Sequence, residues 1–299
     1  MASASSNKDF FGLKELIQPL SPAHYWSHAA QLNGGYVSHG RLRRFGSLLS
    51  APKFSDVYRI IRDWRSPIIA LSSPGGILVS ITPDQAQEFY AAGFPLYFRQ
   101  AQDAFPELLS LRRHIAIDFG VVDEDVFFEL FASPANTGYP AHFDPEINFN
   151  ILLSGRKRWW LAENQTFTNP TRSFALSDRR NVPEELRVAQ VATVPRRLKW
   201  KGPMYCRPGS CVYLPRGCWH KTHASEPTVS LNCTVLPPTW LSLLAAYVSQ
   251  TLNGEHPWRD YALGYATSSS VATLSERLVD FKRVVQGLDA RHLGRILRA

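Results

Sequence analysis

Apolar and polar residues alternate along residues 142–153, the pattern of a β-strand with one polar and one buried face. The polar positions are His142, Asp144, Asn148 and Asn150, and the apolar positions are Ile147, Phe149, Ile151 and Leu153. Residues two apart in a strand point the same way, so His142 and Asp144 can converge on one ion while Phe143 packs behind them. This pattern predicts one wall of a small barrel that encloses a site.

The dipeptide Ser154-Gly155 follows this strand and predicts a two-residue hairpin turn, because glycine adopts positive φ without strain. In that register Lys157 lies opposite Leu152, and directly opposed residues share a face. Lys157 therefore joins the polar face that carries His142 and Asp144. A shift of the register by one residue would turn the lysine outward.

Helical periodicity appears on both sides of this region. Apolar residues recur at helical spacing over 57–64, and Thr82 with Gln85 forms a capping box at the start of a further helix. Two apolar stripes, over 241–252 and 271–288, predict helices near the C-terminus. Residues 164–193 are polar and without clear period, which indicates a long excursion between barrel strands.

The predicted fold is mainly β with flanking helices, arranged as a double-stranded β-helix (jelly roll) core with helical N-terminal and C-terminal parts. The expected organisation is a disordered tail at 1–8, a helical part at 9–124 that packs on the barrel, the barrel core at 125–237, and a helical region at 238–299. The C-terminal helices either pack on the barrel or form a homodimer interface.

A second motif, PGSCVYLPRGCWHKTH at 208–223, places His220 after a short apolar strand and a turn. His223 competes with His220, but only His220 keeps the Gly-x-x-His spacing. Two histidines and one carboxylate leave coordination positions open, which suits non-haem Fe(II) or catalytic zinc. Lys157 favours iron, since its charge could hold the far carboxylate of a dicarboxylate such as 2-oxoglutarate. Tyr139 could donate a hydrogen bond in the same pocket.

The composition of the chain bears on its cellular location and on its binding partners. The chain has 299 residues and four cysteines, with no CxxC, no membrane span and no apolar leader, which predicts a cytoplasmic protein with reduced thiols. The net charge is +8, yet the basic residues are scattered and the densest clusters, at 41–44 and 196–201, are short. A solvated basic face is the favoured interpretation, and nucleic acid is expected only indirectly, through a ribosome-associated substrate.

The segments PAHFDPEINFNILLSGRKRWW and PGSCVYLPRGCWH, with SLNCTV, resemble the cupin-fold JmjC-type 2-oxoglutarate oxygenases. The similarity is closest to the cupin-4 group that includes ribosomal oxygenases, and extends to the hypoxia-inducible factor asparaginyl hydroxylase. The resemblance implies that His142, Asp144 and His220 bind iron. It further implies that Lys157 binds the C5 carboxylate of 2-oxoglutarate and that Asn148 and Asn232 line its pocket. Ser210 departs from the usual Pro-Gly-Asp of the family.

The resemblance implies an Fe(II)- and 2-oxoglutarate-dependent dioxygenase that uses O₂ to hydroxylate a side chain of a protein or peptide. Three alternatives stay open. The first is an N-methyl demethylase that uses the same chemistry. The second is a metal-dependent cupin hydrolase or isomerase, which would not need Lys157. The third is a non-catalytic binding module on the same barrel. Dimerisation, common in the resembled family, would use the C-terminal helices.

Overall fold

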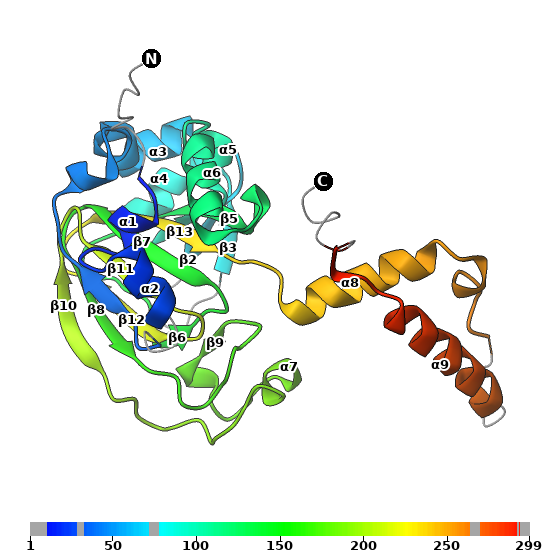
Figure 1. Ribbon diagram of the computed structural model, residues 1–299. Helices are drawn as coiled ribbons and strands as arrows, with labels where there is room; N and C mark the ends of the chain where they lie inside the picture. Colours follow the sequence, from blue (N-terminus) through cyan, green and yellow to red (C-terminus); the bar gives the residue numbers. More distant parts are fainter. Residues whose placement is uncertain (1–10, 29–32, 72–77, 264–269, 292, 294–299) are drawn as a thin grey trace, which may run out of the picture. The chain divides into compact units, whose positions relative to one another are not determined.

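The computed structural model describes residues 11–28, 33–71, 78–263, 270–291 and 293, and the predicted tail at 1–8 lies outside these residues (Figure 1). The chain divides into two compact units, Met1–Pro237 and Pro238–Ala299. The first unit holds two antiparallel β-sheets, and the second holds helices. The predicted fold class, a mainly β jelly roll with flanking helices, is confirmed.

The larger sheet has the strand order β1-β11-β7-β13-β5-β4-β2-β3. Its strands are β1 (Tyr36–Ser38), β2 (Ile68–Leu71), β3 (Leu78–Ile81), β4 (Leu96–Phe98), β5 (Val126–Ser133), β7 (Ile147–Ser154), β11 (Cys211–Leu214) and β13 (Thr228–Val235). The smaller sheet has the order β10-β8-β12-β6-β9. Its strands are β6 (His142–Phe143), β8 (Lys157–Ala162), β9 (Phe174–Ala175), β10 (Lys201–Cys206) and β12 (Trp219–Ala224). From β5 to β8, and again from β10 to β13, consecutive strands alternate between the two sheets, as in a jelly roll.

The two sheets face each other across a shared apolar layer. Leu152 and Leu214 of the larger sheet pack in one buried cluster with Trp159 and Leu161 of the smaller sheet. The alternation of β7 sends Phe149 and Ile151 the other way, into the main core. The predicted two faces of this strand are therefore present, one lining the barrel and one packing beneath the helices.

The predicted hairpin at Ser154-Gly155 is wrong. β7 pairs with β11 and β13, whereas β8 pairs with β10 and β12, so the chain crosses from one sheet to the other at this corner. Gly155 has φ +74° and lies against the carbonyl of Pro227, where no side chain would fit. Lys157 pairs with Cys206 and Ala224 instead of Leu152, and still points into the barrel.

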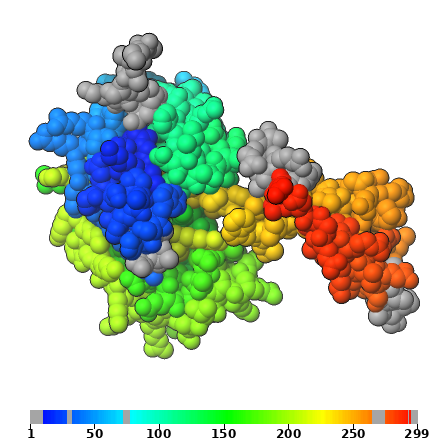
Figure 2. Space-filling view, in the orientation of Figure 1, coloured from blue at the N-terminus to red at the C-terminus, as the bar shows by residue number. Residues whose placement is uncertain are grey.

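Helices cover the outer face of the larger sheet (Figures 1 and 2). They are α1 (Leu13–Leu16), α2 (Pro22–His28), α3 (Val57–Asp63), α4 (Pro83–Ala91), α5 (Ala101–Ala104) and α6 (Leu108–Phe119), with 3-10 turns η2 (Leu42–Phe45), η3 (Leu48–Ser50), η4 (Pro52–Phe54) and η5 (Asp123–Asp125). The segment expected to be helical at 9–124 also contributes four strands, β1 to β4, to the larger sheet. These strands are only three or four residues long, too short for a clear two-residue period.

The excursion between β8 and β10 has its own small core. It contains β9, η6 (Leu176–Asp178) and α7 (Glu184–Arg187). Phe167, Phe174 and Leu186 pack there against Phe143 and Trp219 from the smaller sheet. β9 pairs with β6, the strand that carries His142, so this excursion borders the candidate site.

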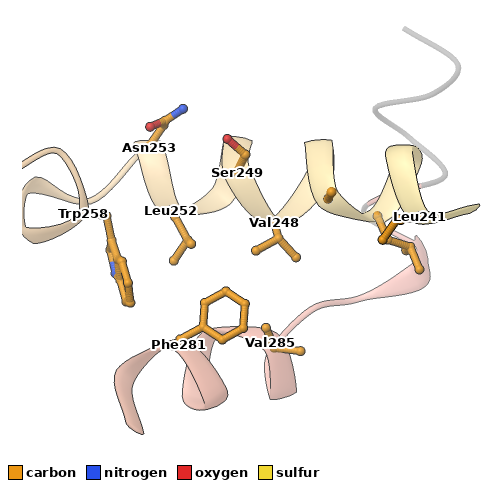
Figure 3. A pocket seen from close by; sticks show the side chains of 10 residues that line it. Leu241, Val248, Ser249, Leu252, Asn253, Trp258, Phe281 and Val285 are labelled. Atoms are coloured by element: carbon orange, nitrogen blue, oxygen red, sulfur yellow. The ribbon is translucent and has the colours of Figure 1, made fainter. Parts of the chain in front are cut away.

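The second unit contains α8 (Trp240–Asn253), η7 (His256–Trp258) and α9 (Ser270–Gln286). Thr239 caps α8, with its hydroxyl accepting a hydrogen bond from the backbone N–H of Ser242. Apolar side chains of both helices line a hollow of about 560 Å³ (Figure 3). Across the described part of the chain, helices of the length and hydropathy needed to span a bilayer are absent.

Candidate metal centre

Strand pairing in the smaller sheet brings the two predicted histidine ligands together. His142 on β6 is the direct antiparallel partner of His220 on β12, and their ring centroids lie 4.1 Å apart. Asp144 follows β6 by one residue and lies on the same side of the chain as His142. Phe143 between them points the opposite way and packs against Trp219 at 4.7 Å. The sequence period therefore places the polar pair inside and the aromatic ring outside.

The three side chains present one ligand atom each to a common point. Asp144 Oδ2 lies 3.7 Å from His142 Nε2 and 3.6 Å from His220 Nε2. Atoms that each lie about 2.0–2.2 Å from one metal ion are at most about 4.4 Å apart, so these separations fit a shared ion. Among the residues that the structure describes, this is the one His/Cys/Asp/Glu group with metal-site geometry.

Neighbouring groups orient each of the three ligands. His142 Nδ1 lies 2.7 Å from the carbonyl of Pro140, and His220 Nδ1 lies 3.1 Å from the carbonyl of Cys218. A carbonyl only accepts, so each Nδ1 donates its proton and each Nε2 lone pair faces inward. Asp144 Oδ1 accepts a hydrogen bond from the hydroxyl of Ser173 at 2.7 Å, which leaves Oδ2 for the ion. This donor set is the one used by non-haem iron and catalytic zinc.

The charges of the cluster also suit a cation. Burial lowers the pKa of His220 to about 4, with help from the adjacent His142, so this imidazole is neutral at pH 7. Burial alone would raise the pKa of Asp144, but the two histidines and the Ser173 hydroxyl together bring it below its ordinary value. One ionised carboxylate and a neutral imidazole are the protonation states in which these side chains bind metal.

Lys157 points into the same cavity from β8. Its side chain is buried, and Nζ lies 5.4 Å from the ring centre of Trp159 and 5.8 Å from that of Tyr139. Burial lowers the pKa of Lys157 to about 8. Among the described residues, no carboxylate forms an ion pair with it. A buried ammonium group without a counter-ion costs free energy, so this position is expected to receive an anion.

Tyr139 lines the cavity beside Lys157 and His142. Its backbone N–H donates to Thr222 Oγ1 at 3.1 Å, which fixes the chain three residues before His142. The hydroxyl is buried and has no hydrogen-bond partner among the described residues. Together with the metal cluster and Lys157 it borders an inner cavity of about 70 Å³. A buried, unpaired hydroxyl next to an unpaired ammonium group indicates a site for an oxygen-rich ligand.

Asn148 and Asn232 lie on the opposite wall of this cavity. Asn232 Nδ2 donates to Asn148 Oδ1 at 2.8 Å and to Glu129 Oε2 at 3.1 Å. The hydroxyl of Thr234 bridges the same two acceptors, and Tyr97 donates its hydroxyl proton to Glu129. Burial raises the pKa of Glu129, although these three donors oppose the rise.

Sequence reasoning missed the role of Glu129. The signal was present, because Glu129 is the only charged residue within the otherwise apolar strand VFFELFAS. Thr234 carries no comparable signal, since threonine is an ordinary strand residue.

A wider cleft of about 680 Å³ borders the metal cluster on its open side. One wall carries Tyr97 and Phe131, whose rings stack in parallel with centroids 4.7 Å apart. The opposite wall is formed by residues 172–183 of the excursion. Glu146 also lines the cleft, where burial and the charge of Asp144 raise its pKa to about 7. The cleft is large enough to admit a side chain to the metal cluster.

Two other sequence candidates lie away from the cluster. His223 is on the outer face of β12, where its Nδ1 accepts a hydrogen bond from the guanidinium of Arg158 at 2.9 Å. His220 is therefore the histidine that the structure brings to Asp144. Ser210, the departure from the family pattern, is buried in a turn and accepts a hydrogen bond from the backbone N–H of Arg207 at 3.1 Å.

The fold and the cluster define the class of the protein: a cupin-like double-stranded β-helix with a two-histidine, one-carboxylate site on the inner face of its barrel. Residues 111–243 of the chain match the sequence model of the JmjC domain. This match confirms the predicted resemblance to JmjC-type proteins.

Two proteins of similar sequence align with different fractions of the chain. An uncharacterised protein of Bacillus subtilis, YxbC, is 26% identical over 265 residues, which are 85% of this chain and 79% of that protein. Jumonji C domain-containing protein 5 of Drosophila melanogaster is 24% identical over 149 residues, 47% of this chain and 37% of that protein.

Solved structures of the Escherichia coli ribosomal oxygenase YcfD share the fold. One superposes with a TM-score of 0.52 at 13% identity, over 91% of this chain and 68% of that chain. Another, in complex with cobalt and succinic acid, gives a TM-score of 0.51 at 14% identity, over 87% of this chain and 65% of that chain.

Proposed function

We propose that the chain is an Fe(II)- and 2-oxoglutarate-dependent dioxygenase that hydroxylates a side chain of a protein or peptide. The observation that carries the proposal is the combination of an inward-facing metal cluster with a buried, uncompensated lysine in one cavity. A metal hydrolase would have no use for the ammonium group of Lys157 and would still bear the cost of burying it. The JmjC domain match and the fold shared with a ribosomal oxygenase support the same function.

The site residues fit the metal and the co-substrate. His142, Asp144 and His220 would hold the iron on one face and leave its other positions open. Lys157 would pair with the C5 carboxylate of 2-oxoglutarate, and the free hydroxyl of Tyr139 would donate to the same group. When bound, iron with 2-oxoglutarate and O₂ supplies the oxidation, which yields succinate, CO₂ and a hydroxylated carbon.

The chain itself contributes orientation and exclusion of water. The carbonyls of Pro140 and Cys218 fix both imidazole rings, and Ser173 fixes Asp144. Asn148 and Asn232 are held by hydrogen bonds to each other and line the co-substrate cavity as a rigid wall. Trp159 stacks on His220 at 5.9 Å and closes the opposite side with its indole.

The cleft beside the cluster supports a macromolecular substrate. Its stacked aromatic wall and the excursion at 172–183 form a groove that can receive a side chain from an extended peptide. The structurally similar YcfD is a ribosomal oxygenase, so ribosomal proteins are the first peptides to test. Hydroxylation and N-methyl demethylation use the same centre and differ in the product released.

A metal-dependent turnover assay tests the proposal. The protein is incubated with 2-oxoglutarate and ribosomal peptides in the presence of Fe(II) or Zn(II), and succinate is measured together with peptide mass. Hydroxylation predicts succinate with Fe(II) only and peptides heavier by one oxygen atom. Demethylation would release formaldehyde instead. Turnover on zinc without 2-oxoglutarate would indicate a hydrolase or isomerase, and binding without turnover would indicate a silent module.

The second unit supports self-association as a further part of the proposal. Leu241 and Leu244 on α8 and Leu278 on α9 are exposed apolar side chains, and Trp258 packs edge-on against Phe281 beside them. Figure 3 shows side chains of both helices pointing into the apolar hollow between them. Two copies of this surface would bury it in a symmetric dimer, which light scattering on the purified protein tests.

The cysteines fit the proposed cytoplasmic location. Cys206, Cys211, Cys218 and Cys233 are all buried and unpaired. Burial raises the pKa of each thiol, so none is activated for disulfide exchange. Fractionation of the host cell, with the protein detected in the soluble fraction, tests this location.

A further inference from the structure

The outer face of the smaller sheet carries a patch of basic and aromatic side chains. Strand alternation turns Lys157, Trp159 and Leu161 inward, so their neighbours face outward. Tyr205 on β10 is the direct partner of Arg158 on β8, and Arg158 is the direct partner of His223 on β12. These three outward side chains therefore form one row across three strands.

A second row lies beside the first on the same face. Trp160 of β8 is the direct partner of Lys221 of β12. Lys221 Nζ lies 5.0 Å from the ring centre of Trp160 and 4.9 Å from that of Trp200. Both indoles are only partly buried, and Tyr205 is 69% exposed. Aromatic faces and cations thus alternate across the sheet.

The patch continues into a hollow of about 990 Å³ at the end of β8 and β10. Arg156, Arg158 and Arg207 line this hollow with Tyr205. Its one acidic residue is Glu226, whose carboxylate lies 3.8 Å from Arg156. Positive charge therefore remains in excess, and Nε of Arg158 has no hydrogen-bond partner among the described residues.

Folding brings the basic run at 41–44 close to the C-terminal end of β10. Residues 196–207 contain five lysines and arginines and no acidic residue, and they lead into and form β10. The second run, at 41–44, approaches the same end of the barrel. Gly209, with φ +92°, packs so closely on the backbone of residues 40–42 that no side chain would fit there. His39 Nδ1 also contacts Ser210 Oγ at 3.1 Å.

We propose that the outer face of β10, β8 and β12, with its adjoining hollow, is a docking surface for single-stranded nucleic acid. Spaced arginines and lysines match the phosphates of a strand, and exposed rings between them match unpaired bases. A duplex would cover its bases and leave the exposed ring of Tyr205 without a stacking partner. Arg156, Arg158, Tyr205 and Arg207 do not line the metal cavity, so binding by these side chains is separable from the proposed oxygenase chemistry.

Fluorescence anisotropy with the full-length protein and a labelled oligouridylate of about 12 nucleotides tests the proposal. The variant Arg156→Glu/Arg207→Glu removes two cations from the hollow. The control Arg62→Glu/Arg113→Glu makes the same change in net charge on α3 and α6, which cover the other sheet. We expect the patch variant to bind at least about tenfold more weakly and the control to stay within about twofold of wild type.

The aromatic contribution and the salt dependence give two further readouts. Tyr205→Ala removes an exposed ring and should weaken binding about tenfold without changing the salt slope. The patch variant should make the slope of log affinity against log salt shallower by about 1.4, the value for two phosphate contacts on a single strand. Equal binding of oligothymidylate supports a surface that does not select the sugar, and weaker binding supports selection for RNA.

Several results would overturn the proposal. These are a patch variant and control that lose affinity equally, a duplex that binds more tightly than the single strand, and polyglutamate or phosphatidylserine vesicles that compete as well as the oligonucleotide. Succinate formation is measured in parallel for every variant. Because the substituted side chains do not line the metal cavity, loss of nucleic-acid binding with intact turnover separates this proposal from the proposed enzyme.

Discussion

The substitution Lys157→Met tests two effects of the buried charge, namely that it destabilises the fold and that it is needed to bind 2-oxoglutarate. Burial lowers the pKa of Lys157 from 10.5 to about 8, a difference of about 3 kcal/mol in favour of the neutral amine. The folded chain binds this proton less tightly than the unfolded chain does. The penalty is therefore fully present below pH 8 and disappears as the pH rises toward 10.5. Methionine keeps the length of the side chain and removes the charge, so the variant should be more stable at pH 7 by up to about 3 kcal/mol.

The same substitution should impair co-substrate binding. Removing one partner of a buried charge pair costs about 2–5 kcal/mol, so KM for 2-oxoglutarate should rise about 30-fold or more. Urea unfolding of the metal-free protein measures the first effect, and succinate formation against 2-oxoglutarate concentration measures the second. The expected variant is thus more stable and much less able to use its co-substrate.

Lys201→Met is the matched control. Lys201 lies on β10, is exposed, and pairs with Glu163 at 3.1 Å. An exposed pair contributes about 0–1 kcal/mol, so this variant should change neither KM nor stability appreciably. The reasoning would be refuted if Lys157→Met raised KM less than about tenfold, or if it destabilised the protein as a core truncation does.

Four other changes test separate parts of the account. His220→Ala should weaken cobalt(II) binding, measured by titration calorimetry, at least about 100-fold, because it removes one of three ligands. Asn232→Ala should cost about 1–3 kcal/mol in urea unfolding, since the one hydroxyl proton of Thr234 can then serve only one of two buried acceptors. Gly209→Ala should cost more than Gly93→Ala, although both glycines have φ +92°, because only the first packs against backbone. Leu244→Asp should convert a dimer into monomers in light scattering, with turnover retained.

Each of these predictions has an outcome that would count against it. Unchanged cobalt affinity after the histidine substitution would remove that residue from the metal site. An asparagine variant as stable as wild type would mean that the buried network relaxes around its loss. Equal losses of stability in the two glycine variants would show that left-handed backbone strain, and not close packing, determines the loss. A monomeric wild-type protein would end the dimer proposal before the leucine is tested.

The sequence was most informative where potential metal ligands also follow the two-residue alternation of a strand. The alternation over 142–153 fixed which residues face the barrel, and the structure places the apolar set in the main core as expected. The Gly-x-x-His spacing of the distal motif favoured His220 over His223, and β12 brings His220 opposite His142. Both inferences depend on local geometry, which a sequence pattern records directly.

The sequence pattern did not predict which strands pair when they are far apart in the chain. The Ser154-Gly155 turn has the composition of a hairpin, and only the wider topology shows that the chain changes sheets there. The facing of Lys157 was predicted correctly from a wrong register, because the alternation along β8 gives the same answer. The network around Glu129 and the packing of Gly209 on residues 40–42 both arise from contacts between residues far apart in sequence.

Turnover under labelled dioxygen tests the central claim most directly. Purified protein is loaded with Fe(II), given 2-oxoglutarate, a hydroxylatable peptide and oxygen-18 gas, and the products are examined by mass spectrometry. The account predicts succinate with one labelled oxygen atom and peptide with another, both lost in His220→Ala. Succinate that stays unlabelled, or peptide oxygen derived from water, would contradict it.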